Sequence, residues 1–172
     1  MDWMLPGLAA VSNSHPMLVH FPIAFWLGAL LFCCLGLVRP DSGLFRAGRW
    51  LLHVGTLSGA VALASGYFAT AAMDHEAPGH EIVHVHRNFM IAAAILSLAA
   101  SCAMFVLRHN SQRWLLLAQV ALLAVVSSVA ALGADRGALL VYGHGLGVRA
   151  EPAPSASERG HGDEAPHAHE HK

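Results

Sequence analysis

The sequence predicts an all-α integral membrane four-helix bundle, up-down-up-down, with a disordered His-rich C-terminal tail. Three observations predict it. First, 55% of the 172 residues are hydrophobic and only 12% are charged, whereas a soluble domain carries about 25% charged residues. Second, four apolar runs of about 20 residues lack Asp, Glu, Lys and Arg, and each can cross about 30 Å of hydrocarbon. Third, the chain from Glu151 onward is polar and has no apolar face to bury.

The transmembrane domain is expected over residues 18–149, with helices at about 18–38, 51–72, 89–107 and 115–134. An N-terminal arm over residues 1–17 precedes it, and a linker and tail over residues 150–172 follow it. Backbone groups in lipid must pair internally, so each apolar run must be helical. Because the connections are short, sequential helices pack as antiparallel neighbours.

Two prolines and a stripe of small residues mark the first two helices. Pro16 suits the first turn of a helix, while Pro22 removes a helical hydrogen bond and should kink the first turns. The second helix carries small residues on one face, namely Gly55, Gly59, Ala62 and Gly66. Such residues let another backbone approach closely. Packing within the bundle is the first interpretation of this face, and a homodimer seam or a slot for a flat cofactor are the alternatives.

Arginine positions predict the orientation. The first connection holds Arg39, Arg46 and Arg49, and the third holds Arg108 and Arg113. Cytoplasmic connections are enriched in Lys and Arg, so these two should face the cytoplasm and both termini should lie outside it. The lipid bilayer is then the first partner. The net charge of −1 gives no basic field for nucleic acid.

The histidines gather on one side of the predicted bundle. Of 13, only His53 and His109 fall on the inner side under the arginine topology. Those on the outer side are His15, His20, His75, His80, His84, His86, His144, His161, His167, His169 and His171. Such a cluster is where a metal or haem site can be assembled from different helices.

His20 lies beside Pro22 within the apolar part of the first helix. An ionisable group at that depth is costly unless it has a partner. We weigh two interpretations equally: His20 is a cofactor ligand, or it is a neutral histidine hydrogen-bonded to a carbonyl freed by Pro22.

Two other histidine motifs have a chemical and a plain interpretation. His80-Glu81-x-x-His84 matches the zinc-protease pattern, but the pattern is short and no other segment supplies a recognisable third ligand. We therefore favour an electron-transfer or binding protein over a stand-alone enzyme. The other interpretation of this motif is an exposed connection between helices. Glycines alternate around His144 and permit a sharp turn. They predict either a flexible exit from the fourth helix or a loop folded back over the outer mouth, which would bring His144 near His20.

Three motifs together resemble a known family. They are His15-Pro-x-x-Val-His20-Phe-Pro-Ile, a histidine-containing segment ending at Asn88, and Leu140-Val-Tyr-x-His144-Gly-x-Gly-Val. They resemble the bacterial membrane proteins grouped as Domain of Unknown Function 2231, over roughly residues 12–149. Members often have a histidine four residues before the asparagine, here His84, with His86 an extra candidate. The resemblance implies four helices in the bacterial inner membrane, so the histidine side would be periplasmic. Some relatives carry Rieske iron–sulfur domains, which implies redox work.

The leading functional hypothesis is a b-type haem protein that passes electrons between the membrane and a periplasmic or membrane redox partner. Bis-histidine ligation needs two imidazoles on facing helices at the same depth. His20 with His84 or His86 meets that condition, and His15 or His144 could serve a second site.

Two other hypotheses stay open. In the second, the outer histidines and the tail collect copper, zinc or nickel, which imidazole suits. The tail ligands would be His161, His167, His169 and His171. In the third, the chain is a non-catalytic membrane subunit whose histidines only shape the fold.

Overall fold

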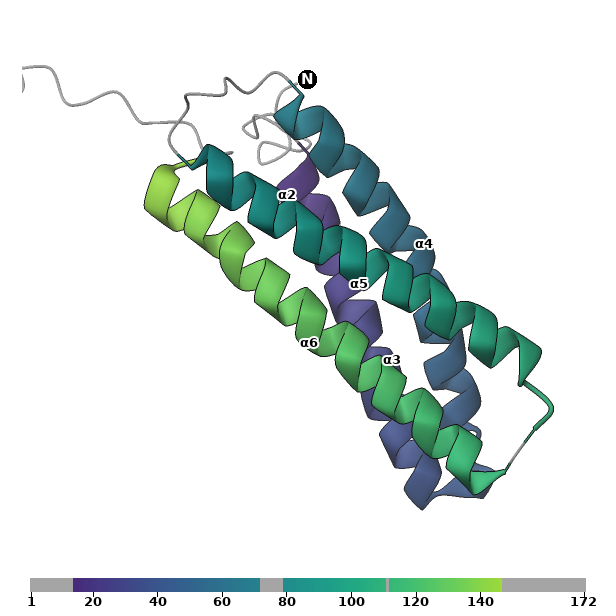
Figure 1. Cartoon of the computed structure of the whole chain (residues 1–172). Helices are drawn as coiled ribbons and strands as arrows, with labels where there is room; N and C mark the ends of the chain where they lie inside the picture. The colour runs from purple at the N-terminus through teal and green to yellow at the C-terminus, as the bar shows by residue number, and fades with distance from the viewer. Residues whose placement is uncertain (1–13, 72–78, 111, 147–172) are drawn as a thin grey trace, which may run out of the picture.

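The computed structural model describes residues 14–71, 79–110 and 112–146, which form a bundle of long apolar helices (Figure 1). The elements in order are α2 (His15–Leu18), α3 (His20–Val38), the 3-10 turn η1 (Pro40–Ser42), α4 (Leu44–Thr70), α5 (His80–Val106) and α6 (Arg113–His144). Within these residues, four candidate spans are long and apolar enough to cross a membrane. The predicted all-α four-helix fold is therefore confirmed.

The helices run past the predicted apolar runs, and the difference is largest in α6. This helix has 32 residues, so at 1.5 Å per residue it is about 48 Å long, against about 30 Å of hydrocarbon. Its ends project into the interfacial layers, where polar side chains are tolerated. Charged residues therefore do not mark the end of this helix, and Asp135 and Arg136 lie on its exposed face.

The sequence places residues 140–144 in a glycine-rich loop after the fourth helix, and this prediction is wrong because these residues continue α6. The apolar residues before His144 extend the helix, and Gly145 ends it with a φ of 65°. The N–H of Gly145 donates to the carbonyl of Val141 and that of Leu146 to Leu140, both at 3.0 Å. A residue with left-handed backbone angles at a helix end lets the last carbonyls accept hydrogen bonds. Glycine is favoured here because it adopts those angles without strain.

The first span is interrupted at Val19, which separates α2 from α3. Pro22 follows three residues later. It has no N–H to donate to the carbonyl of Leu18, and its ring crowds that turn. The break therefore lies where the sequence predicts a disturbance, and Pro16 occupies the first turn of α2 as expected.

The small-residue face of α4 packs against α3. A Cβ placed on Gly55 would lie 2.8 Å from Cδ1 of Trp26, and one on Gly59 would lie 2.8 Å from Cζ2 of the same ring. Trp26 is buried by this contact. The face therefore serves packing within the chain, the first of its three interpretations.

Large apolar side chains also cover the outside of the bundle. They include Phe21 on α3, Leu57 and Phe68 on α4, Ile95 on α5 and Leu132 on α6, all exposed. Exposed apolar surface of this extent on every helix fits a hydrocarbon surrounding rather than water. Together with the four spans, it identifies a multi-pass membrane protein.

The two halves of the bundle are built alike. A shift of 71 residues (from 15 to 86, for example) carries α3 onto α5 and α4 onto α6 with the chain direction preserved. The halves meet through α4 with α5 and α3 with α6, so they are related by a pseudo-two-fold axis along the bundle, as in transporters with parallel repeats. The buried positions that coincide are Pro22 with Ala93, Trp26 with Ser97, Ala29 with Ala100, Cys33 with Met104, Gly48 with Gln119, Leu52 with Leu123, Gly55 with Val126, Gly59 with Ala130 and Ala62 with Gly133.

Candidate functional site

The two ends of the bundle differ in chemistry. The starts of α2 and α5 and the ends of α4 and α6 form one end, which we call the histidine end. The connections over residues 39–43 and 107–112 form the other, which we call the arginine end. Most of the described histidines lie at the first end and most of the described arginines at the second, as the sequence predicts. The exceptions are His53 and His109 toward the arginine end and Arg87 and Arg136 toward the histidine end.

His15 reaches from the start of α2 onto α4. Its Nδ1 lies 3.1 Å from the carbonyl oxygen of Ala62 and 2.9 Å from Oγ of Ser65. A carbonyl only accepts, so Nδ1 carries the proton and the neutral ring has its lone pair on Nε2. The Ser65 hydroxyl donates to the same carbonyl at 2.7 Å. Gly66 makes room for the ring, because a Cβ there would lie 2.8 Å from Cε1 of His15.

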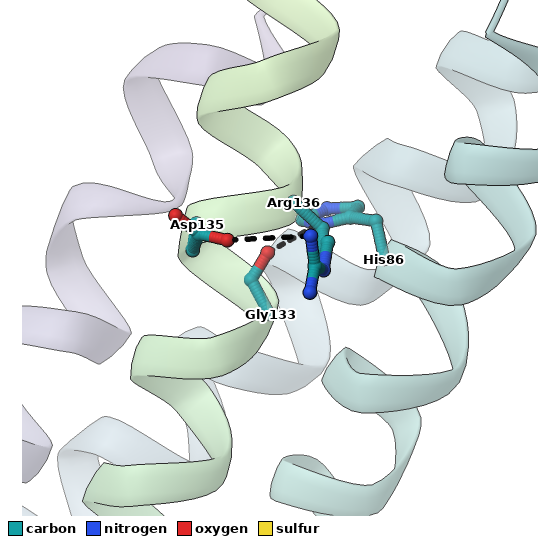
Figure 2. Close-up of polar contacts among 4 residues, drawn as sticks. All are labelled: His86, Gly133, Asp135 and Arg136. Carbon is teal, nitrogen blue, oxygen red and sulfur yellow. Dashed lines mark hydrogen bonds and ion pairs between the residues drawn. The ribbon is translucent and has the colours of Figure 1, made fainter.

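His86 makes the matching contact between α5 and α6. Its Nδ1 lies 2.8 Å from the carbonyl oxygen of Gly133, and Figure 2 shows the ring directed at that carbonyl. The same argument leaves the lone pair of the neutral ring on Nε2. A Cβ on Gly137, one turn further along α6, would lie 3.0 Å from Cε1 of His86. Figure 2 also shows the ion pair between Asp135 and Arg136, at 3.6 Å.

The two histidines occupy equivalent positions in the two halves. His15 and Ala62 are 47 residues apart, as are His86 and Gly133, and the shift of 71 residues carries the first pair onto the second. The glycine beside each ring follows its hydrogen-bonded carbonyl by one helical turn in both halves. The ring centres of His15 and His86 lie 6.4 Å apart, and the ring planes are inclined by 78°. All four candidate spans thus contribute. The first and third supply the imidazoles, and the second and fourth supply the carbonyls.

His20 does not join this pair. Its side chain is exposed on the outside of the bundle. The interior stripe of the first span runs through Pro22, Trp26 and Ala29, and His20 lies two residues before Pro22, on the opposite side of the helix. The structure therefore brings His86 together with His15, and not with His20 as the leading hypothesis expected.

The remaining described histidines lie at the rim of the histidine end. The rings of His80 and His84 meet edge to face with centres 4.5 Å apart, because residues four apart lie on one face of a helix. Nη2 of Arg87 donates to Nδ1 of His84 at 2.6 Å. His144 lies against the start of α5, since a Cβ on Gly79 would be 3.2 Å from its Cγ.

The described residues do not form a larger cluster of metal-ligating side chains. Across residues 14–71, 79–110 and 112–146, no three His, Cys, Asp or Glu side chains are grouped as they would be to hold a metal ion. The tail candidates His161, His167, His169 and His171 lie outside the described residues.

The sequence contains a pattern that identifies His15 and His86 as a pair, although the spacing of histidines within a single helix does not reveal it. Histidines at 15 and 86 and glycines at 66 and 137 share the same offset. An internal repeat at that offset selects His15 and His86 from the outer histidines without any knowledge of the fold.

Comparison with known families gives one match. A family model described as Predicted membrane protein (DUF2231) matches residues 12–150. The matched region covers every candidate span and both histidines of the pair, and it ends before the tail. Comparisons with curated proteins and with solved structures give no match.

Proposed function

Given that the chain belongs to the DUF2231 family of predicted membrane proteins, we propose that it binds a b-type haem between His15 and His86 and carries electrons to a redox partner at the membrane. One observation carries the proposal: two imidazoles stand at equivalent positions of a pseudo-symmetric bundle, and each is anchored through Nδ1–H to a backbone carbonyl. A group bound between them receives the same ligand from both halves.

The separation of the rings supports one metal ion between them. A linear imidazole–metal–imidazole unit with bonds of about 2 Å places the ring centres about 6 Å apart, and those of His15 and His86 are 6.4 Å apart. In a haem the porphyrin supplies the other iron ligands, so two axial imidazoles complete the set.

The hydrogen bonds of the pair also suit ligation. A metal-bound histidine almost always donates its other ring N–H to a carbonyl, carboxylate or water, which fixes the tautomer and raises the basicity of the ligating nitrogen. In both His15 and His86 the carbonyl takes the Nδ1 proton. Nε2 is therefore the nitrogen that would bind iron.

The small residues of α4 and α6 near the pair are already in contact within the bundle. Gly66 lies against His15 and Gly137 against His86, while Gly59 lies against Trp26 and Gly133 against Met90. Gly66 and Gly137 therefore position the two imidazoles that would hold the haem. Iron held there would exchange single electrons, while the bundle supplies the ligands and an apolar surrounding.

A reduced minus oxidised difference spectrum of protein purified from haem-supplied cells tests the proposal. The wild type should show the Soret and α bands of a low-spin, six-coordinate haem. His15→Ala and His86→Ala should each lose most of it. His20→Ala and His84→Ala remove the same group from the same end and should keep it. A wild type without a Soret band, or equal loss in all four variants, would refute the proposal.

A further inference from the structure

A cleft of about 730 Å³ opens between α4 and α5 at the arginine end. Its walls combine guanidinium groups with apolar side chains. The polar part is formed by Arg46, Arg49 and Arg108, and the apolar part includes Trp50, Met104 and Phe105. The described residues that line it include no carboxylate. The cleft therefore combines a cationic and an apolar lining.

Two of its arginines are held in fixed positions. Nη1 of Arg49 donates to the carbonyl of Arg108 at 2.9 Å, which ties α4 to the connection after α5. The guanidinium of Arg108 lies 4.5 Å from the ring centre of Phe105, and that of Arg49 lies 5.8 Å from that of Phe45. A guanidinium has five N–H donors, and the carbonyl bond uses one of those on Arg49. Nε of Arg108 donates to Nε2 of His109 at 3.1 Å, so a second contact orients its guanidinium.

Deeper in the same interface, Nδ1 of His53 and Oγ of Ser101 form a hydrogen bond between α4 and α5. Both residues line the cleft. Polar groups inside a membrane span are costly and usually mark a binding site or a pathway.

The pseudo-two-fold axis provides a comparison within the chain. The interface of α3 with α6 is the counterpart of the interface of α4 with α5. The shift of 71 residues replaces each Arg, His and Ser of the cleft by an aliphatic residue: Arg46 by Leu117, Arg49 by Val120, His53 by Ala124, Ser101 by Leu30, Arg108 by Leu37 and His109 by Val38. The bundle thus packs at this depth without any of these polar groups. Arg39 and Arg113 place positive charge at the same end without lining this cleft.

We propose that the cleft binds one anionic phospholipid. The phosphate lies between the guanidiniums of Arg49 and Arg108, whose planar forks match phosphate oxygens. The acyl chains run along the exposed rings of Trp50 and Phe105 into the hydrocarbon layer. Basic pockets between transmembrane helices take anionic headgroups in this way.

Native mass spectrometry of the delipidated full-length protein tests the proposal, with phosphatidylglycerol and phosphatidylcholine as probes. Phosphatidylglycerol should bind as a single tight adduct, and phosphatidylcholine at least about tenfold more weakly. Arg49→Val and Arg108→Leu introduce the residues of the counterpart positions. Each should weaken phosphatidylglycerol binding about tenfold, because a charge-assisted hydrogen bond is lost. Arg39→Gln removes the same charge at the same end and should leave the affinity within about twofold.

Several results would overturn the proposal. Equal affinity for the two lipids would show that the cleft does not recognise headgroup charge. Equal weakening by Arg39→Gln and Arg49→Val would show that net charge alone attracts the lipid. Inorganic phosphate that displaces the lipid at equal concentration would show a free-phosphate site instead. Where Arg49→Val does not fold, Arg49→Lys keeps the charge and loses the fork. It should bind several-fold more weakly, and unchanged affinity would overturn the proposal equally.

Discussion

His15 and His86 meet at the histidine end with ring centres 6.4 Å apart, although they belong to different halves of the chain. Each donates from Nδ1 to a carbonyl 47 residues further along. The hydrogen bond between a histidine and a carbonyl therefore occurs twice, once in each half. Because the two halves are related by a pseudo-two-fold axis, anything bound between the rings meets an imidazole that is anchored to a backbone carbonyl on both sides.

This equivalence predicts that the glycines beside the rings matter equally. Gly66→Ala would place a Cβ 2.8 Å from Cε1 of His15, and Gly137→Ala one 3.0 Å from Cε1 of His86. Each ring must then turn away from its carbonyl. Loss of such a supporting hydrogen bond costs about tenfold or more in affinity, so both variants should lower haem affinity by similar factors in a haem titration. Gly28→Ala, where the nearest atom would be 3.4 Å away, serves as the control. A tenfold difference between the Gly66 and Gly137 variants would contradict equivalence.

The spans could be predicted from the sequence because length and apolar composition alone decide whether a helix crosses hydrocarbon. Their ends could not. The rule that a span lacks charge ended the fourth helix at Ala134, whereas α6 continues to His144. Asp135 and Arg136 fit because both side chains lie on the exposed face and pair with each other at 3.6 Å.

The pairing of the histidines depends on packing rather than on local pattern. His15 and His20 are five residues apart, so only one of them can face the interior of the first span. The buried stripe through Pro22 and Trp26 selects His15. Depth along the bundle, the criterion applied to the sequence, favoured His20 because it ignores which side of the helix is buried.

Gly48 should be a site of close helix contact on which stability depends. A Cβ on Gly48 would lie 2.9 Å from both the carbonyl oxygen of Ala29 and the backbone N of Cys33. Backbone atoms cannot turn away as a flexible side chain can, so α3 and α4 must separate. Gly48→Ala should lower the free energy of unfolding by about 1–3 kcal/mol, measured by denaturant titration in detergent. Gly28→Ala at the same interface should change it by less than about 1 kcal/mol. Equal stability of the two variants would contradict the close approach.

Both termini should face the periplasm, because the arginine end is expected to stay in the cytoplasm. Alkaline phosphatase fused after Arg149 should be active in cells, and the same enzyme inserted between Arg39 and Arg49 should be silent. The reverse pattern would invert the topology and place the histidine pair on the cytoplasmic side.

The tail should bind metal without supporting the fold. Its four histidines, His161, His167, His169 and His171, should take up copper, zinc or nickel weakly, since imidazole suits these ions. Protons compete for the same nitrogen, so binding should be present above about pH 6.5 and be lost below it. Truncation after Ala150 should abolish this binding in calorimetric titration and leave expression and thermal stability unchanged. Loss of expression would mean that the tail packs on the bundle.

Exchange of one axial ligand should shift the redox potential. This prediction rests on the proposed haem site. Methionine in place of one axial histidine raises the potential of a haem, because a thioether donates less charge to ferric iron than an imidazole does. His86→Met should therefore raise the midpoint potential by on the order of 0.1 V, within the roughly 0.8 V that axial ligands span. By equivalence of the two halves, His15→Met should raise it by a similar amount.

Spectroelectrochemical titration of the purified protein measures both shifts. His84→Met changes a histidine near His86 on α5 whose Nδ1 accepts from Arg87, and it should leave the potential unchanged. A haem-loaded His86→Met variant with the wild-type potential would show that His86 does not bind the iron. A shift for His86→Met without one for His15→Met would break the symmetry and move the second ligand to another histidine of the same end.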